Sequence, residues 1–372
     1  MPNVALGHVS NDFMIAALII YSLAVLAFAG DFAFGRPKRS AVTSRAQVPE
    51  RADALAAVGA SATASGVSGS AVSGTSGVPA ASAVSGVSGA VVSGAGAGGS
   101  VPDSMPPVAL PPLRAILAAG EWVRAGMALS TAGVLAHALA VITRGFAVHR
   151  APWGNMYEFV TALTCFAAIF FLWVMIRYRA WALGVFVIGA VVVVLGLAET
   201  LIYTAAGNLV PALQSYWLSI HVTAMTVSTG VFFVAAVLGV VYLAVDHHNR
   251  RVAAGKAQPG NGIIARLPSL EQLDRLAYRT VVFGFPVWTF GVIAGAIWAD
   301  EAWGRYWGWD PVETWAFITW VVYAAFLHAR ATAGWRGRRA HYVQLLGFAT
   351  LSFNILVVQV FITGLHSYAG VG

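Results

Sequence analysis

Eight long apolar segments constrain the fold of this chain more than any other feature of its sequence. An α-helix needs roughly 20 apolar residues to cross a bilayer, and only 10% of the 372 residues are charged. The segments are too continuously apolar for the alternating pattern of a membrane β-barrel. We therefore predict an all-α polytopic membrane protein with about eight transmembrane helices, at residues 12–34, 122–142, 156–176, 181–202, 217–245, 278–298, 312–329 and 343–364.

The distribution of basic residues predicts how these helices are oriented, because Lys and Arg resist translocation and stay on the cytoplasmic side. If both termini are extracytoplasmic, all but three of the 22 basic residues fall in cytoplasmic segments. The exceptions are Arg144, Arg150 and Arg305. The net charge of +7 is then a consequence of topology, so we expect no nucleic-acid partner.

The apolar pattern divides the chain into three parts. Residues 1–35 hold the first transmembrane helix, and residues 116–372 form a membrane domain of seven helices. Between them, residues 36–115 contain loose repeats such as "SGVSGSAVSGTSGV", a composition that is typical of a disordered linker. We expect this cytoplasmic linker to be a passive tether, with a docking segment as the alternative. The remaining loops are short, so function must reside at helix ends and in the loops that join them.

The chain has a single cysteine, Cys165, which lies inside the third predicted helix. One cysteine cannot form an intrachain disulfide or a Cys-X-X-Cys redox pair. Any thiol chemistry at this protein must therefore use the cysteines of another protein.

The external segment between the sixth and seventh helices is rich in tryptophan. Five of the 13 tryptophans fall between positions 298 and 315, and the segment includes the string "WGRYWGWDPVETW". An aromatic belt at the membrane surface is one interpretation, but a belt requires no fixed spacing. Gly304 and Gly308 alternate with Trp303, Trp307 and Trp309, which favours a platform where backbone and indole rings lie against a planar apolar ligand.

The acidic end of this string has a local structural interpretation. Asp310 occupies the position of an N-cap, Pro311 that of the first helical residue, and Glu313 that of the capping-box acid. Both acids are therefore structural candidates. A helix that begins here also directs backbone N–H groups toward the tryptophan loop, which would suit carboxylate groups on the ligand.

Three of the nine histidines have informative positions. His221 lies near the external end of the fifth predicted helix, and His366 follows the eighth. Two histidines from different helices at the level of the tryptophan loop are what axial ligation of a haem iron requires, although a single membrane histidine is more often a packing residue. His328 lies 17 residues beyond Pro311, about 26 Å along the helix. We expect His341 to be a solvated or interfacial residue and not a ligand, and we leave the role of His137 open.

Taken together, these residues resemble the CcsA (ResC) family of system II cytochrome c maturation, within a haem-handling superfamily that carries a tryptophan-rich "WWD" loop. The resemblance covers the eight predicted helices and excludes the linker. It is carried by the strings "APWGNMYEF", "SYWLSIHV", "GAIWADEAWGRYWGWDPVETWAFITWVVYAAFLHAR" and "GLHSY".

The resemblance implies a haem path with two stations. His221 and His366 would ligate the iron of haem b at the WWD loop, residues 298–313, and His328 would bind haem in the membrane together with a histidine of a partner. The implied cofactor-binding residues are His221, His366, His328, Trp303, Trp307, Trp309, Asp310 and Glu313.

The resemblance also implies a reaction and its partners. The chain would be the membrane subunit of a holocytochrome c synthase, or haem lyase, which attaches haem to an apocytochrome c with a Cys-X-X-Cys-His segment. The partners would be a separate CcsB (ResB) membrane protein and a thioredoxin-like thiol reductant. The expected location is the bacterial cytoplasmic membrane, with the site on the extracytoplasmic face. The alternative function is a haem exporter or chaperone that delivers haem without attaching it.

Overall fold

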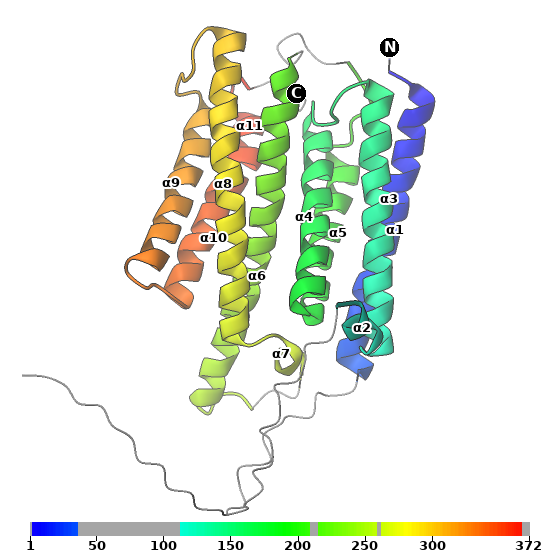
Figure 1. Ribbon diagram of the computed structural model, residues 1–372, viewed down its shortest axis with the longest axis vertical. Helices are drawn as coiled ribbons and strands as arrows, with labels where there is room; N and C mark the ends of the chain where they lie inside the picture. The colour runs from blue at the N-terminus through cyan, green and yellow to red at the C-terminus, as the bar shows by residue number, and fades with distance from the viewer. Residues whose placement is uncertain (1, 36–111, 209–214, 259–261, 367–372) are drawn as a thin grey trace, which may run out of the picture. The chain divides into compact units, whose positions relative to one another are not determined.

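The computed structural model describes residues 2–35, 112–208, 215–258 and 262–366. Within these ranges every regular element is helical, and eight helices are long and apolar enough to cross a membrane (Figure 1). The predicted fold class, an all-α multi-pass membrane protein, is thereby confirmed. The spanning helices are α1 (Val4–Phe34), α3 (Glu121–Val148), α4 (Met156–Tyr178), η1 and α5 (Trp181–Leu183, Gly184–Leu201), η3 and α6 (Leu218–Val222, Thr223–Ala253), α8 (Leu270–Trp303), α9 (Pro311–Ala331), and α10, η4 and α11 (Arg338–Phe353, Asn354–Val358, Gln359–Phe361).

The helices extend beyond the predicted apolar spans, most clearly at the start of α8. The apolar run begins near residue 278, but the helix begins at Leu270. Ser269 forms a capping box with Gln272, in which each side chain accepts a hydrogen bond from the other residue's backbone N–H (3.3 and 3.2 Å). Hydropathy detects only the part of a helix that needs an apolar environment, whereas the cap determines where the helix starts.

The predicted linker at residues 36–115 lies outside the described residues, except for its last few. Residues 112–115 begin the short helix α2 (Pro112–Leu117). A second short helix, α7 (Ile263–Arg266), precedes α8.

Helix α6 contacts helices on both of its sides. It packs against α4 and α5 on one side, and against α8 and α10 on the other (Figure 1).

Helices α1 and α3 pair closely, because two glycines of α3 lie against aromatic rings of α1. A Cβ added at Gly126 would be 2.7 Å from the Phe28 ring, and a Cβ added at Gly133 would be 2.6 Å from the Tyr21 ring. Small residues at such crossings allow membrane helices to approach closely.

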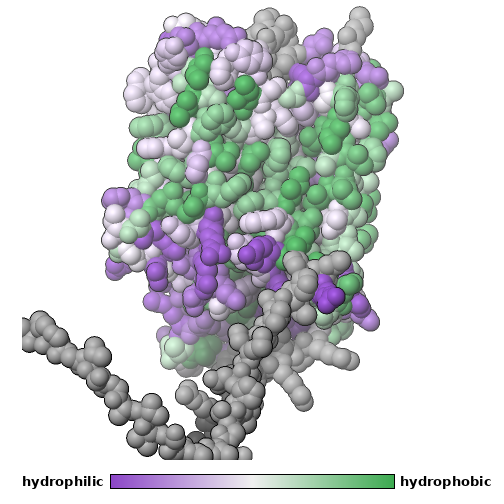
Figure 2. All heavy atoms as spheres, in the orientation of Figure 1, coloured by the Kyte–Doolittle hydropathy of each residue, from purple (hydrophilic) through white to green (hydrophobic). Residues whose placement is uncertain are grey.

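The outward faces of the spanning helices carry large apolar side chains. Figure 2 shows apolar residues over the middle of the drawn face and polar residues gathered toward the ends. Exposed apolar side chains in the spans include Leu26, Leu135, Val193, Phe290 and Leu356. Such continuous apolar exposure is stable in lipid and costly in water, as a multi-pass membrane protein requires.

Candidate functional site

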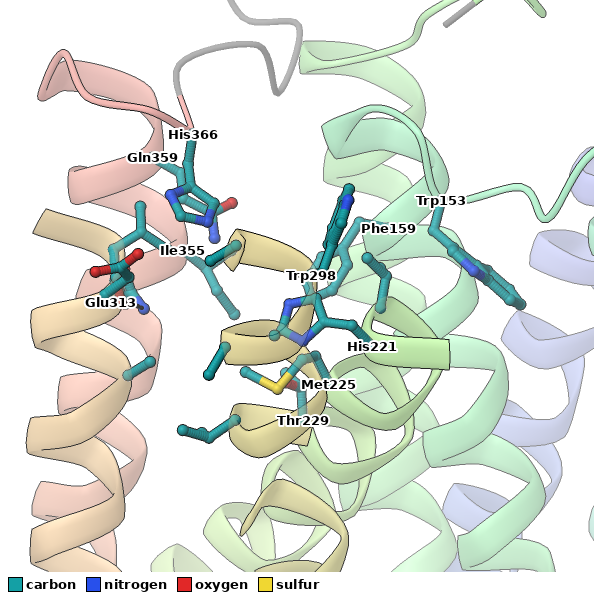
Figure 3. A pocket seen from close by; sticks show the side chains of 18 of the residues that line it. Trp153, Phe159, His221, Met225, Thr229, Trp298, Glu313, Ile355, Gln359 and His366 are labelled. Carbon is teal, nitrogen blue, oxygen red and sulfur yellow. Dashed lines mark hydrogen bonds between the residues drawn. The ribbon is translucent and has the colours of Figure 1, made fainter. Parts of the chain in front are cut away.

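A cavity of about 170 Å³ lies at the end of the bundle where α4, η3 and α9 begin and α8 and α11 end. We call this the tryptophan end, because most of the tryptophan loop lies here. The close-up in Figure 3 shows side chains from these elements converging on the cavity. Its lining is mainly apolar and aromatic, as expected of a site for a flat organic ligand. The aromatic lining includes Trp153, Phe159, Trp288, Trp298, Trp303 and Trp307.

His221 lines this cavity from a π-helical turn, η3, at the start of the fifth spanning helix. Its Nδ1 donates to the carbonyl oxygen of Gly291 on α8 (2.8 Å). Because a carbonyl can only accept, this bond places the proton on Nδ1 and the lone pair on Nε2. Gly295 makes room for the ring, since a Cβ there would lie 2.6 Å from Cε1 of His221. The imidazole is therefore held in the tautomer and position that a metal ligand needs.

His366 lines the cavity from the segment after α11 (Figure 3). Its Nδ1 lies 2.9 Å from Oδ2 of Asp310, and its ring meets the Trp303 ring edge-to-face with centroids 5.2 Å apart. A carboxylate bonded to one ring nitrogen is the usual support of a histidine that ligates through the other. The two histidines that the sequence selected thus reach the same cavity, His221 from η3 and His366 from the segment after α11.

Asp310 connects the start of α9 to the C-terminal segment. One carboxylate oxygen accepts from the backbone N–H of Leu365 (2.7 Å), and the other accepts from Val312 N–H (3.1 Å) and from His366. Burial by itself raises the pKa of the Asp310 carboxyl, but these hydrogen bonds outweigh burial, and the pKa lies below its ordinary value. The group is therefore ionised, so the His366 Nδ1 is the donor.

Glu313 lines the cavity and closes the capping box that the sequence predicted. Its Oε2 accepts from the backbone N–H groups of Gly308 (2.9 Å) and Asp310 (3.2 Å). The expectation that this helix start offers N–H groups to carboxylates of a ligand is not supported, because the chain's own acids accept from Gly308, Asp310 and Val312.

The tryptophans of the loop divide into two groups. Trp303, at the end of α8, and Trp307 line the cavity. Trp309 is 66% exposed and lies outside the cavity lining, and its ring packs edge-on against Phe317. Of the predicted platform, only the first two rings therefore line the cavity.

The two glycines of the loop have local packing and conformational roles. Gly304 ends α8 in the left-handed conformation, with φ of 69°, and an added Cβ there would meet nothing. Gly308 lies against the guanidinium of Arg305. The sequence suggested that these two glycines let the backbone approach a flat ligand. Their contacts show a helix end at Gly304 and a neighbouring guanidinium at Gly308 instead.

His328 lies far from the cavity, on an exposed face of α9 near that helix's other end. Close to it, Arg330 donates two hydrogen bonds to Asp274 (2.8 and 3.0 Å). His341 is buried beside this pair, with Nε2 3.2 Å from Asp274 and its ring stacked on Tyr242. The prediction that His341 is solvated or interfacial was wrong, because helix packing turns this residue inward.

A buried ion cluster stands behind one wall of the cavity. Arg144 and Arg150, two of the three basic residues that the charge pattern predicts to be external, both pair with Glu158 (3.2 and 2.7 Å), whose side chain is fully buried. Glu158 also accepts from Gly154 N–H (2.9 Å), next to Trp153 in the lining. Sequence reasoning assigned no role to Trp153. The available signal was the pair Arg144 and Arg150, which the positive-inside rule leaves on the side with few basic residues.

Comparisons with known proteins identify the family to which the chain is similar. Residues 153–366 match the family described as "Cytochrome C assembly protein". The "Cytochrome c biogenesis protein CcsA" of Guillardia theta is 39% identical over 237 residues, which cover 58% of this chain and 76% of that protein. The protein of the same name from Synechococcus sp. (strain CC9902) is 42% identical over 180 residues, 44% of this chain and 59% of its own length.

Among solved structures, one titled "Cytochrome c Heme Lyase CcmF" aligns with a TM-score of 0.46 at 20% identity. The alignment covers 66% of this chain and 43% of that one.

The family match begins at Trp153 and ends at His366, so it spans both cavity histidines and the tryptophan loop between them. Six of the eight apolar helices lie within this matched region, and α1 and α3 precede it in the sequence. We conclude that the chain is a multi-pass membrane protein of cytochrome c maturation and belongs to the CcsA family of cytochrome c assembly proteins.

Proposed function

We propose that this chain is the membrane subunit of a cytochrome c synthase, which carries haem b across the membrane and presents it in the aromatic cavity for attachment to an apocytochrome c. The observation that supports this most is the pair His221 and His366. Nδ1 of His221 bonds the Gly291 carbonyl and Nδ1 of His366 bonds the Asp310 carboxylate, and these bonds hold both rings beside the cavity in which the iron would be ligated. Trp303 and Trp307 supply apolar area for the macrocycle.

The reaction mainly requires that the haem and the apocytochrome peptide be held in the correct relative position. A cysteine thiol of the Cys-X-X-Cys-His segment adds across a haem vinyl group: a sulfur–carbon bond forms, the thiol proton goes to the other vinyl carbon, and no net electrons are transferred. Holding haem and peptide in register makes the addition effectively intramolecular. Exchange of His366 or His221 for the histidine of the apocytochrome would then release the product.

His328 would form the second haem station with a histidine of a CcsB-type partner. Its side chain is exposed on the outer face of α9, where a second membrane protein can reach it. The Asp274–Arg330 pair two residues away fixes this part of α9 against α8. A thioredoxin-like protein would keep the substrate thiols reduced, because Cys165 is buried in this chain.

The bacterial cytoplasmic membrane is the proposed location, with the cavity on the extracytoplasmic face. The positive-inside rule supports this orientation, since the tryptophan end carries few basic residues. The thylakoid membrane is the alternative location.

Reconstitution tests the proposal directly. The chain, a CcsB-type partner and an apocytochrome are expressed in cells without other maturation factors, and covalent haem is detected on denaturing gels. Haem-stained cytochrome c is the expected result. A complex that binds haem but yields no covalent product would instead favour an exporter or chaperone.

A matched pair of substitutions tests the cavity itself. Trp307→Ala should weaken haem retention by about 1–3 kcal/mol through lost stacking area. Trp309→Ala should change it less, because Trp309 lies outside the lining. Equal haem content in both variants and in the native complex would contradict the assignment of the site.

A further inference from the structure

Several hydrogen-bond donors in the cavity wall are buried without a protein acceptor. Within the described part of the chain, the indole Nε1 atoms of Trp153, Trp288 and Trp298 and the hydroxyl of Thr229 have no partner, and all four residues line the cavity. Buried polar groups in native proteins are nearly always satisfied by protein, water or ligand. Donors gathered around one cavity therefore indicate a ligand that brings acceptor atoms.

Two of these donors lie at the deep end of the cavity. Thr229 is 4% exposed and follows His221 by eight residues, about 12 Å along the helix. Trp288 is 1% exposed and precedes Gly295, which contacts His221, by seven residues on α8. Figure 3 shows Met225 and Thr229 on successive turns below His221. We call Thr229 and Trp288 the cavity floor.

The opposite rim is unsuitable for an anion. Glu313 belongs to the lining there, and Asp310, which lies outside the lining, bonds His366. The backbone N–H groups that these acids bind, Gly308 and Val312 among them, are not available to a ligand. Negative groups of a ligand are repelled from this rim, whereas the floor contains no acidic residue among its lining side chains.

We propose that the cavity floor binds the propionate carboxyl groups of haem, with Thr229 and Trp288 as hydrogen-bond donors. This inference rests on the proposed function. The propionates and the vinyl groups lie on opposite edges of the macrocycle, and the vinyls must face the external apocytochrome. With the propionates on the floor, the vinyl edge points toward the tryptophan loop. Thr229 and Trp288 thereby determine which edge of the haem reacts.

Asn354 is a further group with an unpartnered atom, but it lies at the rim. Its Nδ2 donates to the Val312 carbonyl (3.1 Å), and its Oδ1 is a buried acceptor without a partner in the described residues. A water molecule would satisfy this atom, and the propionates are not assigned to it.

Comparing the affinity for haem b with the affinity for its dimethyl ester isolates the contribution of the propionate groups to binding. The two are titrated into the full chain in detergent and followed by the absorbance of the bound haem. The native chain should bind haem b at least about tenfold more tightly than the ester, because the ester loses charge-assisted hydrogen bonds. The double variant Thr229→Val, Trp288→Phe should bind the ester as tightly as the native chain does. Its affinity for haem b should fall, so that the ratio of the two affinities comes close to one.

Matched controls remove equivalent groups elsewhere. Thr226→Val deletes a buried hydroxyl that bonds the Val222 carbonyl, and Trp320→Phe deletes an indole N–H that bonds Thr289. Neither residue lines the cavity, so both controls should keep the native ratio.

Each contrary outcome has a distinct meaning. If the double variant keeps the native ratio, the floor atoms bind only water and the inference is wrong, while the proposed function stands. If the native chain binds neither porphyrin, the proposed function fails, and the inference falls with it.

Discussion

Nδ1 of His366 donates a 2.9 Å hydrogen bond to Oδ2 of Asp310, across 56 positions of sequence. The same carboxylate caps α9 and accepts from the backbone of Leu365. The residue that starts the helix after the tryptophan loop therefore also orients a histidine from the far end of the chain. A pattern that is local in sequence serves a long-range function here.

Asp310→Asn should weaken haem binding about 10–100-fold, because the imidazole loses its carboxylate partner and becomes a poorer ligand. Titration of haem into the purified variant measures this. Asp300→Asn changes an acid at the same end of the molecule that does not line the cavity, and it should leave the affinity unchanged. Equal affinities in the two variants would show that Asp310 is only a helix cap.

Gly295→Ala should lower haem content without unfolding the protein. The new Cβ would lie 2.6 Å from Cε1 of His221, so the ring must move away from its position. Gly196→Ala, on α5, is the control because a Cβ there meets no atom within 4 Å. Haem per mole of purified protein is the measurement, and native content in Gly295→Ala would argue against His221 as a ligand.

His221→Gly and His366→Gly should each reduce cytochrome c assembly and respond to external imidazole. The lost side chain leaves an open coordination position at a cavity near the surface, which a free imidazole can fill. His328→Gly should respond less, because that residue lies toward the other end of α9. If imidazole restores neither cavity variant at normal protein levels, these histidines pack and do not bind iron.

Glu158→Ala should destabilise the protein by about 3–5 kcal/mol, since it leaves two buried guanidinium groups without their carboxylate. Thermal unfolding in detergent would show a clear fall in Tm. Glu271→Ala removes an exposed carboxylate paired with Arg275, and should cost about 0–1 kcal/mol. Similar melting temperatures for both variants would mean that the cluster contributes no more than a surface pair.

Cysteine labelling tests the orientation in the membrane. Lys256→Cys and Arg336→Cys should not react with an impermeant thiol reagent added outside, whereas Ala302→Cys at the tryptophan end should react. Native Cys165 is buried and gives little background. The reverse labelling pattern would place the cavity on the cytoplasmic side and remove the proposed encounter with external apocytochromes.

The sequence by itself determined the eight helices, the capping box at Asp310 and Glu313, and the placement of His221 and His366 at one end of the bundle. These features are local. Hydropathy describes the apolar character of about 20 consecutive residues, and a helix cap depends on three or four neighbouring positions.

Only the tertiary structure decided which faces of the helices meet. It places Trp307 in the lining and Trp309 outside it, buries His341 beside Asp274, and brings Glu158 between two arginines. It also places Thr229 and Trp288 at the floor of a cavity whose walls come from segments far apart in the chain. Every residue of a membrane helix lies in an apolar stretch, so periodicity does not separate lipid-facing from cavity-facing positions, and contacts between helices alone make that distinction.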